Sequence, residues 1–235
     1  MAVYVLVHGS WLGGWVWRKV TPRLRAAGHD VYAPSLTGLG DRAHLARPEV
    51  DLALHIDDIA NLIAHEELSG IVLVGHSYAG MVITAVADRM PERIAHLVYL
   101  DAVVPVDGKS VLDVIPKAMA EQVRAGVKAN DGWRLPPAPP AALGVVDAAD
   151  ARWLTAHARG MPIRTHEQPI KLSGEYAAVP KRTFVYCSNP AIGGLEAMAK
   201  TAQTDPAWRY HEIETGHDPM ITTPEELSQI LLGCR

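Results

Sequence analysis

The sequence has few of the residues that mark extracellular, membrane-spanning or metal-binding chains. Its two cysteines, Cys187 and Cys234, form neither a disulfide framework nor the spacing of a metal site. No apolar run is long enough to cross a bilayer, and the chain enters an apolar segment at residue 3 without the basic start of a signal peptide. We therefore expect a cytoplasmic protein with no metal and no membrane partner.

Charge of one sign is also scarce. The formal net charge is −4 and charged residues of both signs make up 20% of the chain. Such a balance does not favour binding to nucleic acid or to an anionic membrane surface. A hydrophobic fraction of 49% in 235 residues is enough for one domain with a substantial core. We expect residues 1–235 to form that single domain.

Short apolar runs alternate with segments of helical spacing along most of the chain. Runs without polar residues are typical of parallel strands that are buried on both faces. Strands are predicted at 3–7, 29–33, 71–74, 94–101, 183–187 and 208–213. Helices are predicted at 17–27, 52–68, 81–90, 195–202 and 224–232. The expected architecture is an α/β fold with a mostly parallel six-stranded sheet flanked by helices.

Residues 106–170 interrupt this alternation. Two helical pieces, 111–124 and 148–159, flank a proline-rich stretch at 133–140 in which we expect no strand. The segment keeps apolar residues for packing, which favours a helical cap or lid inserted over the α/β core rather than a linker. Core packing is the expected role of lid residues such as Ile115, Met119 and Leu135.

The most informative stretch is residues 71–80, where an apolar run leads into Ser77 and small residues follow. A strand, a sharp turn and a helix are the setting of a nucleophile elbow, in which small neighbours let strand and helix approach closely. Ala79 stands where that motif usually has glycine. The turn would expose the Ser77 hydroxyl and direct the Tyr78 N–H toward an oxyanion. The alternative is an ordinary turn in which Ser77 only caps the helix.

A second loop suited to oxyanion binding follows the first strand. Gly9 directly after that strand allows the backbone to approach a neighbouring segment. We assign the Ser10 N–H as the second oxyanion donor, beside that of Tyr78. The candidate pocket residues are His8, Gly9, Trp11, Trp133 and Trp153.

A base and an acid are available at the carboxyl ends of other predicted strands, where ligands bind in open α/β sheets. His217 follows Gly216 in the loop after the last strand and is the expected general base for Ser77. Asp101 ends the strand that comes after the elbow and is a candidate acid. The other histidines weighed as bases are His8, His44, His55, His65, His76, His96, His157, His166 and His211, and His76 is expected to point away along the turn.

With these residues the chain resembles the α/β-hydrolase superfamily. Within it, the chain is similar to the small esterases related to plant hydroxynitrile lyases, salicylate-ester-type methyl esterases and the bacterial esterase C group. The resemblance rests on residues 5–11, 75–81, 97–105 and 216–220. It implies a six-stranded core, a helical cap over the pocket and acyl chemistry that needs no cofactor.

Two departures from the resemblance affect the predicted chemistry. Lyases of this group carry Thr at the position of Gly9 and Lys at the position of Asp218, so this chain is expected to be an esterase. Relatives usually place the acid three residues beyond the strand cysteine, where this chain has Pro190. Asp101 is the preferred replacement because some lipases of this fold present their acid from the strand after the elbow. The acids or neutral orienters left open are Asn189, Asp205 and Asp218.

The predicted function is that of a serine carboxylesterase which cleaves a small hydrophobic or aromatic ester or lactone through an acyl-enzyme on Ser77. A small-molecule ester is the expected partner, and a homodimer is left open. The alternatives are a lyase or cyclase that uses the same pocket, and a receptor-like protein that binds a ligand with little turnover.

Overall fold

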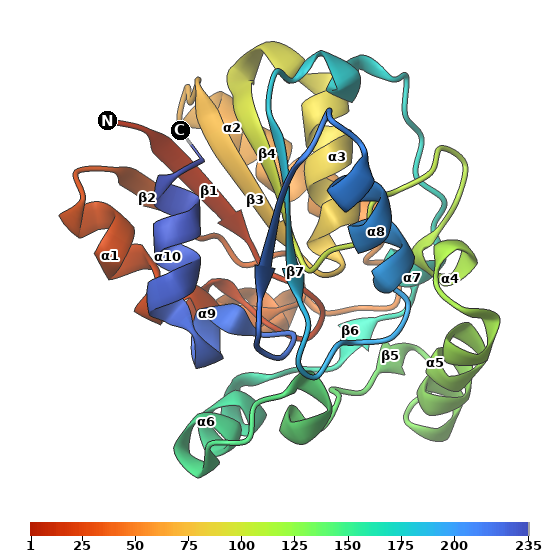
Figure 1. The fold of residues 1–235 in the computed structure, drawn as a ribbon. Coiled ribbons are helices and arrows are strands. Elements are labelled where there is room, and N and C mark those ends of the chain that lie inside the picture. The colour runs from red at the N-terminus through yellow and green to blue at the C-terminus, as the bar shows by residue number, and fades with distance from the viewer. Residues whose placement is uncertain (235) are drawn as a thin grey trace.

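A computed structural model describes residues 1–234. Six parallel strands form its central sheet (Figure 1). Their order in the sheet is β2-β1-β3-β4-β7-β8, and every neighbouring pair is parallel. The strands are β1 (Val3–Val7), β2 (Asp30–Tyr32), β3 (Ile71–His76), β4 (Ile94–Leu100), β7 (Arg182–Cys187) and β8 (Arg209–Ile213). The predicted six-stranded sheet is confirmed, and all of its strands run parallel to one another.

Helices cover both faces of the sheet, which explains why its strands are apolar at successive positions. In β1, Tyr4 and Leu6 pack with the cluster on one face, whereas Val5 and Val7 pack with the cluster on the other. The helices of the first face are α1 (Thr21–Ala26) and α10 (Pro224–Leu232). Those of the second face are α2 (Leu52–His65), α3 (Ala79–Arg89) and α8 (Glu196–Thr204).

Prolines divide two of the predicted helices. The helix expected at 17–27 is split into a 3-10 helix, η1 (Gly14–Lys19), and α1, with Pro22 in the first turn of α1. The helix expected at 111–124 is split around Pro116 into α4 (Val111–Val114) and α5 (Lys117–Ala129). Proline lacks the backbone N–H that a helix interior requires, so it is tolerated only at a helix start.

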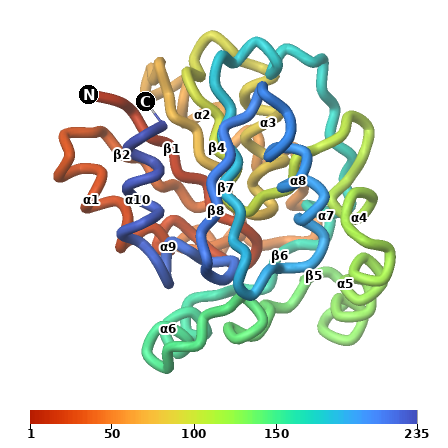
Figure 2. Tube along the Cα trace, viewed as in Figure 1, coloured from red at the N-terminus to blue at the C-terminus, as the bar shows by residue number. Residues whose placement is uncertain are grey.

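The inserted segment lies across one end of the sheet, as the green part of the chain in Figure 2 shows. Besides α4 and α5 it contains α6 (Ala148–His157), α7 (Arg164–Glu167) and two short strands. These strands, β5 (Arg134–Leu135) and β6 (Met161–Pro162), pair antiparallel. The expectation of a strandless stretch at 133–140 is therefore wrong, because two residues are too few to produce a recognisable alternation next to prolines.

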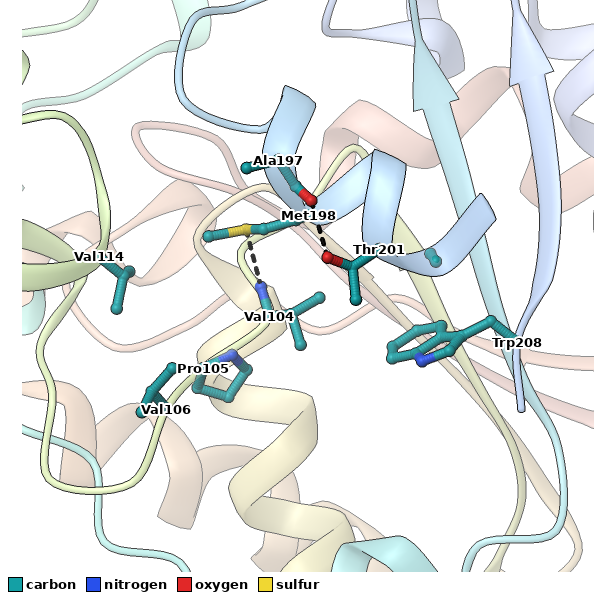
Figure 3. Close-up of a pocket in the computed structure, with 9 residues that line it drawn as sticks. Val104, Pro105, Val106, Val114, Ala197, Met198, Thr201 and Trp208 are labelled. Atoms are coloured by element: carbon teal, nitrogen blue, oxygen red, sulfur yellow. Dashed lines mark hydrogen bonds between the residues drawn. The ribbon is translucent and has the colours of Figure 1, made fainter. Parts of the chain in front are cut away.

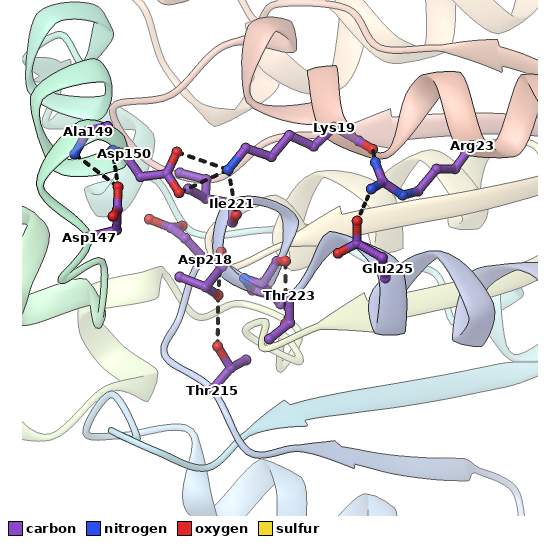
Figure 4. Close-up of polar contacts among 12 residues, drawn as sticks. Lys19, Arg23, Asp147, Ala149, Asp150, Thr215, Asp218, Ile221, Thr223 and Glu225 are labelled. Carbon is purple, nitrogen blue, oxygen red and sulfur yellow. Dashed lines mark hydrogen bonds and ion pairs between the residues drawn. The ribbon is translucent and has the colours of Figure 1, made fainter.

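Polar contacts fasten the lid to the core beside the last loop (Figure 4). Lys19 Nζ in η1 donates to both carboxylate oxygens of Asp150 in α6 at 2.9 Å and to the carbonyl of Ile221 at 3.0 Å. Ile221 belongs to α9 (Pro219–Thr222), which follows directly after His217 and Asp218.

The remaining short 3-10 helices are η2 (Gly40–Leu45), η3 (Pro91–Arg93), η4 (Pro140–Leu143) and η5 (Glu175–Ala178). None of the helices described over residues 1–234 combines the length and the apolar character needed to span a membrane.

Candidate active site

Ser77 occupies a strained turn between β3 and α3. Its φ is 56°, in the left-handed region that residues other than glycine rarely adopt. A Cβ on Gly75 would lie 2.8 Å from the carbonyl oxygen of Ala79, so the strand and the helix approach too closely for a side chain there. The elbow geometry expected from the sequence is therefore present at Ser77.

The imidazole of His217 bridges Ser77 and Asp101. His217 Nε2 lies 2.8 Å from Ser77 Oγ, and His217 Nδ1 lies 2.6 Å from Asp101 Oδ2. A carboxylate accepts hydrogen bonds, so Nδ1–H donates to Asp101 and the lone pair of Nε2 faces the Ser77 hydroxyl. This is the tautomer that a general base for Ser77 needs.

The surroundings of His217 favour its protonated form despite burial. Burial alone would lower the pKa of His217, but the hydrogen bond and the charge of Asp101 outweigh it and hold this pKa above its usual value. Asp101 is itself completely buried, and its second oxygen accepts from the Cys187 N–H at 3.2 Å. The carboxylate is therefore fixed from two sides.

The other residues considered as the acid lie elsewhere. Asn189 Nδ2 donates to Glu214 at the surface at 3.4 Å, and Asp205 accepts from the N–H of Ala207 after α8. Asp218 is buried, and its Oδ1 lies 3.6 Å from Nε2 of His76 rather than against the ring of His217. Of these four candidates, the structure brings only Asp101 to His217.

Two histidines near Ser77 have structural hydrogen bonds. The ring of His76 packs against that of His217 with centroids 4.6 Å apart, and its Nε2 donates to the His217 carbonyl at 2.8 Å. It therefore lies beneath His217 rather than pointing away along the turn. His8 Nε2 accepts from the Leu36 N–H at 3.0 Å, and burial lowers the pKa of His8 to about 4.

A cavity of about 120 Å³ opens at Ser77 and His217. Its walls include Ser10, Tyr78 and Trp11, all expected there. The lid adds Ile115, Met119 and Leu135, for which the sequence predicts core packing. The loop after β7 adds Ile192, Gly193 and Leu195.

Of the five expected pocket residues only Trp11 lines this cavity, and two of the others, Trp133 and Trp153, have partners elsewhere. Trp153 packs against Trp15 of η1 at 4.9 Å between ring centroids, under the guanidinium of Arg18. Trp133 lies under its neighbour Arg134, with the guanidinium carbon 4.7 Å from the ring centroid. Both indoles thus have a cationic partner, and the partner of Trp153, Arg18, is distant in the sequence.

His8 and Gly9 lie behind the cavity rather than in its wall. A Cβ on Gly9 would lie 2.9 Å from Cβ of Ser77 and 2.7 Å from Nδ1 of His76. Gly9 therefore lets the loop after β1 contact the elbow, and His8 fastens that loop to residue 36.

His166 lines the cavity, although from the sequence it is a candidate only as an alternative base. It comes from α7 in the lid, and its Nε2 lies 3.1 Å from Ser10 Oγ. Its ring stacks on that of Tyr78, with centroids 5.0 Å apart. Ser10 and His166 are 156 positions apart, so no local pattern in the sequence joins them.

A larger apolar groove of about 440 Å³ lies between α8 and the chain after β4 (Figure 3). Val104, Pro105, Met198 and Trp208 are among its lining residues, and the Val104 N–H points at the sulfur of Met198 at 3.3 Å. Ser77, His217 and Asp101 do not line it, so its size alone does not make it the active site. In residues 1–234, no group of three or more His, Cys, Asp or Glu is arranged to hold a metal ion.

The sequence has relatives that match over almost its whole length. The sequence profile described as the alpha/beta hydrolase family matches residues 4–230. A carbendazim hydrolyzing esterase of Nocardioides sp. (strain SG-4G) is 40% identical over 98% of this chain and 98% of that protein. Methylesterase 1 of Arabidopsis thaliana is 28% identical over 97% of this chain and 94% of that protein.

The fold has a close match among solved structures. An extracellular alpha/beta-hydrolase from a Paenibacillus species superposes with a TM-score of 0.89 and 23% identity, covering 100% of this chain and 99% of that one. At this identity the likeness concerns the fold alone.

Proposed function

The chain belongs to the alpha/beta hydrolase family and is an ester hydrolase like its relatives, and we propose that Ser77, His217 and Asp101 are its catalytic triad. One observation carries the proposal: the ring of His217 lies 2.8 Å from the Ser77 hydroxyl and 2.6 Å from the Asp101 carboxylate. A nucleophile, a base and an orienting acid in one hydrogen-bonded chain are what serine acyl transfer requires.

In the proposed mechanism, His217 Nε2 takes the proton of Ser77 as Oγ attacks the ester carbonyl. The carbonyl oxygen becomes an oxyanion that accepts from the N–H groups of Ser10 and Tyr78. Protonated His217 then gives its proton to the departing alcohol, which leaves an acyl group on Ser77. Water, deprotonated by His217, attacks this acyl-enzyme and releases the acid.

The cavity supports a small apolar substrate. At about 120 Å³ it is smaller than the usual pockets for drug-sized ligands. Val103, Val111 and Ile115 are among its apolar lining residues. We propose that the substrate is a small hydrophobic or aromatic ester or lactone, over which residues 106–170 act as the lid of a single domain.

Two positions favour ester hydrolysis over cyanohydrin cleavage. The backbone at Gly9 leaves no space for the threonine that lyases carry there, since a Cβ would approach Ser77 and His76 within 3 Å. Asp218, which is buried beside His76, occupies the position after His217 where lyases carry lysine. A receptor with little turnover would fit an incomplete triad, whereas Asp101 offers His217 an acid in place of the one missing at Pro190.

The proposed function is tested by turnover of p-nitrophenyl acetate and butyrate with wild type, Ser77→Ala and a control, Ser69→Ala, in an exposed loop before β3. We expect turnover and fluorophosphonate labelling in wild type and in the control, and neither in Ser77→Ala. Reaction in H₂¹⁸O should place one solvent oxygen in the acid product, as hydrolysis requires. A folded wild type that neither turns over nor labels would refute the proposal.

A cytoplasmic location is a prediction from the sequence, which also leaves a homodimer open.

A further inference from the structure

A chain of hydrogen bonds runs from the lid to the loop after β1. Thr165 Oγ1 donates to the carbonyl oxygen of Pro162 at 2.6 Å, and a carbonyl only accepts. This bond uses the single hydroxyl proton of Thr165. The neighbouring contact, between Thr165 Oγ1 and His166 Nδ1 at 2.9 Å, must therefore have His166 as its donor.

The proton on Nδ1 fixes the role of the other ring nitrogen. Burial lowers the pKa of His166 to about 3, so the ring is neutral and carries one proton. Because that proton is on Nδ1, Nε2 has a lone pair and accepts from the Ser10 hydroxyl at 3.1 Å. The proton of Ser10 Oγ consequently points at the lid.

The Tyr78 hydroxyl is oriented in the same way. His55 Nε2 donates to the Thr37 carbonyl at 2.9 Å, and burial lowers the pKa of His55. Its Nδ1 therefore accepts from the Tyr78 hydroxyl at 3.1 Å. The protons of both hydroxyls are directed to histidine nitrogens, so neither proton is available to a substrate.

Ser10 Oγ can then only accept a hydrogen bond from a substrate. It lines the catalytic cavity, and each hydroxyl oxygen has two lone pairs. The same residue provides the backbone N–H that we place at the scissile carbonyl, so its Oγ lies next to the atoms attached to that carbonyl.

We propose that Ser10 Oγ is a specificity-determining acceptor, which selects esters with an N–H or O–H within two bonds of the scissile carbonyl. The inference rests on the proposed function, because it takes the carbonyl to be bound beside Ser10. A substrate with such a donor gains a buried hydrogen bond, whereas one with only an oxygen acceptor there places two lone pairs face to face.

Three small esters of similar shape test this selection. Methyl 2-hydroxybutanoate presents a donor, methyl 2-methoxybutanoate presents only an acceptor, and methyl 2-methylbutanoate presents neither. We expect Ser10→Ala to reduce the hydroxy-to-methoxy ratio of kcat/KM roughly three- to tenfold relative to wild type, the usual range for one net hydrogen bond. Comparing ratios between variants cancels intrinsic reactivity and any general loss of activity.

Thr165 provides a second variant whose side chain does not reach the cavity. It is completely buried behind His166. In Thr165→Val the acceptor of Nδ1–H is lost, so His166 can carry its proton on Nε2 and donate to Ser10. The Ser10 proton then becomes free to face the substrate, and we expect the ratio to shift toward the methoxy ester. Thr165→Ser keeps the hydroxyl and should keep the wild-type ratio, which a purely steric role of Thr165 would not predict.

The outcomes separate this inference from the proposed function. Esters that are not turned over are compared by Ki against p-nitrophenyl acetate. If p-nitrophenyl acetate itself is not hydrolysed, the proposed function fails and the inference falls with it. If it is hydrolysed and the ratio is the same within twofold in wild type, Ser10→Ala and Thr165→Val, the inference alone is refuted. A ratio that falls in both variants and is kept in Thr165→Ser supports it.

Discussion

Ser77 and Asp101 stand at the ends of adjacent parallel strands, and both have positive φ values, 56° and 43°. The two turns are joined, because the Ser77 N–H donates to the carbonyl of Leu100 at 3.1 Å. The Asp101 N–H in turn donates to the carbonyl of Val185 in β7 at 2.7 Å. Strained turns persist only where the surroundings hold them, and here three neighbouring strands hold both ends of the proposed triad.

Asp101→Asn tests the assignment of the acid. Asparagine keeps the shape but would present either a donor or a neutral acceptor to His217, so the required tautomer is no longer favoured. We expect kcat for p-nitrophenyl acetate to fall by about 10⁴, the cost typical of losing a triad acid. Asn189→Ala and Asp205→Asn are the matched controls and should remain near wild type. A loss below tenfold in Asp101→Asn would contradict the assignment.

The pH dependence of kcat/KM should report the ionisation of His217. His217 acts as a base only when neutral, and its pKa is raised above 6.5 by Asp101. Activity should therefore fall as the pH drops, with a midpoint above pH 6.5. In Asp101→Asn the remaining influence of burial lowers this pKa, so the midpoint of the residual activity should move to lower pH. An unchanged midpoint would mean that Asp101 does not control His217.

Gly9→Ala should impair catalysis without unfolding the protein. The added Cβ would lie 2.9 Å from Cβ of Ser77, so the elbow or the loop must shift. A displacement of about 1 Å at reacting groups costs on the order of 10² in rate, and we expect that loss in kcat. Gly126→Ala in α5 is the control, because its Cβ would meet its nearest neighbour, Pro136, at an ordinary 3.9 Å. Equal activity of the two variants would refute the steric argument.

Asp218→Asn should change how stability depends on pH. Burial raises the pKa of Asp218 from 3.8 to about 6, and neither carboxyl oxygen has a hydrogen-bond partner among the described residues. Because the pKa of Asp218 is higher in the folded protein, its protonated carboxyl group contributes fully to the stability of wild type below pH 3.8. This contribution to stability is lost as the pH rises through about 6. Asparagine does not titrate.

Urea unfolding at pH 4 and pH 8 measures this effect. From pH 4 to pH 8, the free energy of unfolding of Asp218→Asn should rise relative to that of wild type by up to about 3 kcal/mol. A shift of about two pKa units corresponds to that energy. Glu49→Gln, an exposed carboxylate, is the control and should show little change. A pH-independent difference for Asp218→Asn would mean that the carboxyl group ionises freely in the fold.

The sequence predicts the sheet well because each central strand is buried on both faces and is apolar at nearly every position. The elbow is predictable for a related reason, since Ser77 lies between a strand and a helix that are consecutive in sequence. The predicted family and esterase activity are confirmed by the relatives. These features all depend on neighbours along the chain.

What the sequence does not predict depends on distant contacts. Leu135 and Met161 pair as strands across 25 residues of lid, and His166 reaches Ser10 from 156 positions away. Trp153 is expected in the pocket from the sequence, but it packs instead against Trp15 and Arg18 of η1. No periodicity encodes such contacts, because each joins elements whose orientation follows from the whole fold.

In the proposed triad the acid is Asp101, so the loop after β7 carries no proposed catalytic residue. This loop contributes Ile192, Gly193 and Leu195 to the cavity at Ser77, while the proposed acid follows the neighbouring strand β4. Mutations in the loop can therefore reshape the cavity without touching the hydrogen bonds of His217. In a fold where one loop usually serves both purposes, this chain can diverge toward new esters, or be engineered toward them, one residue at a time.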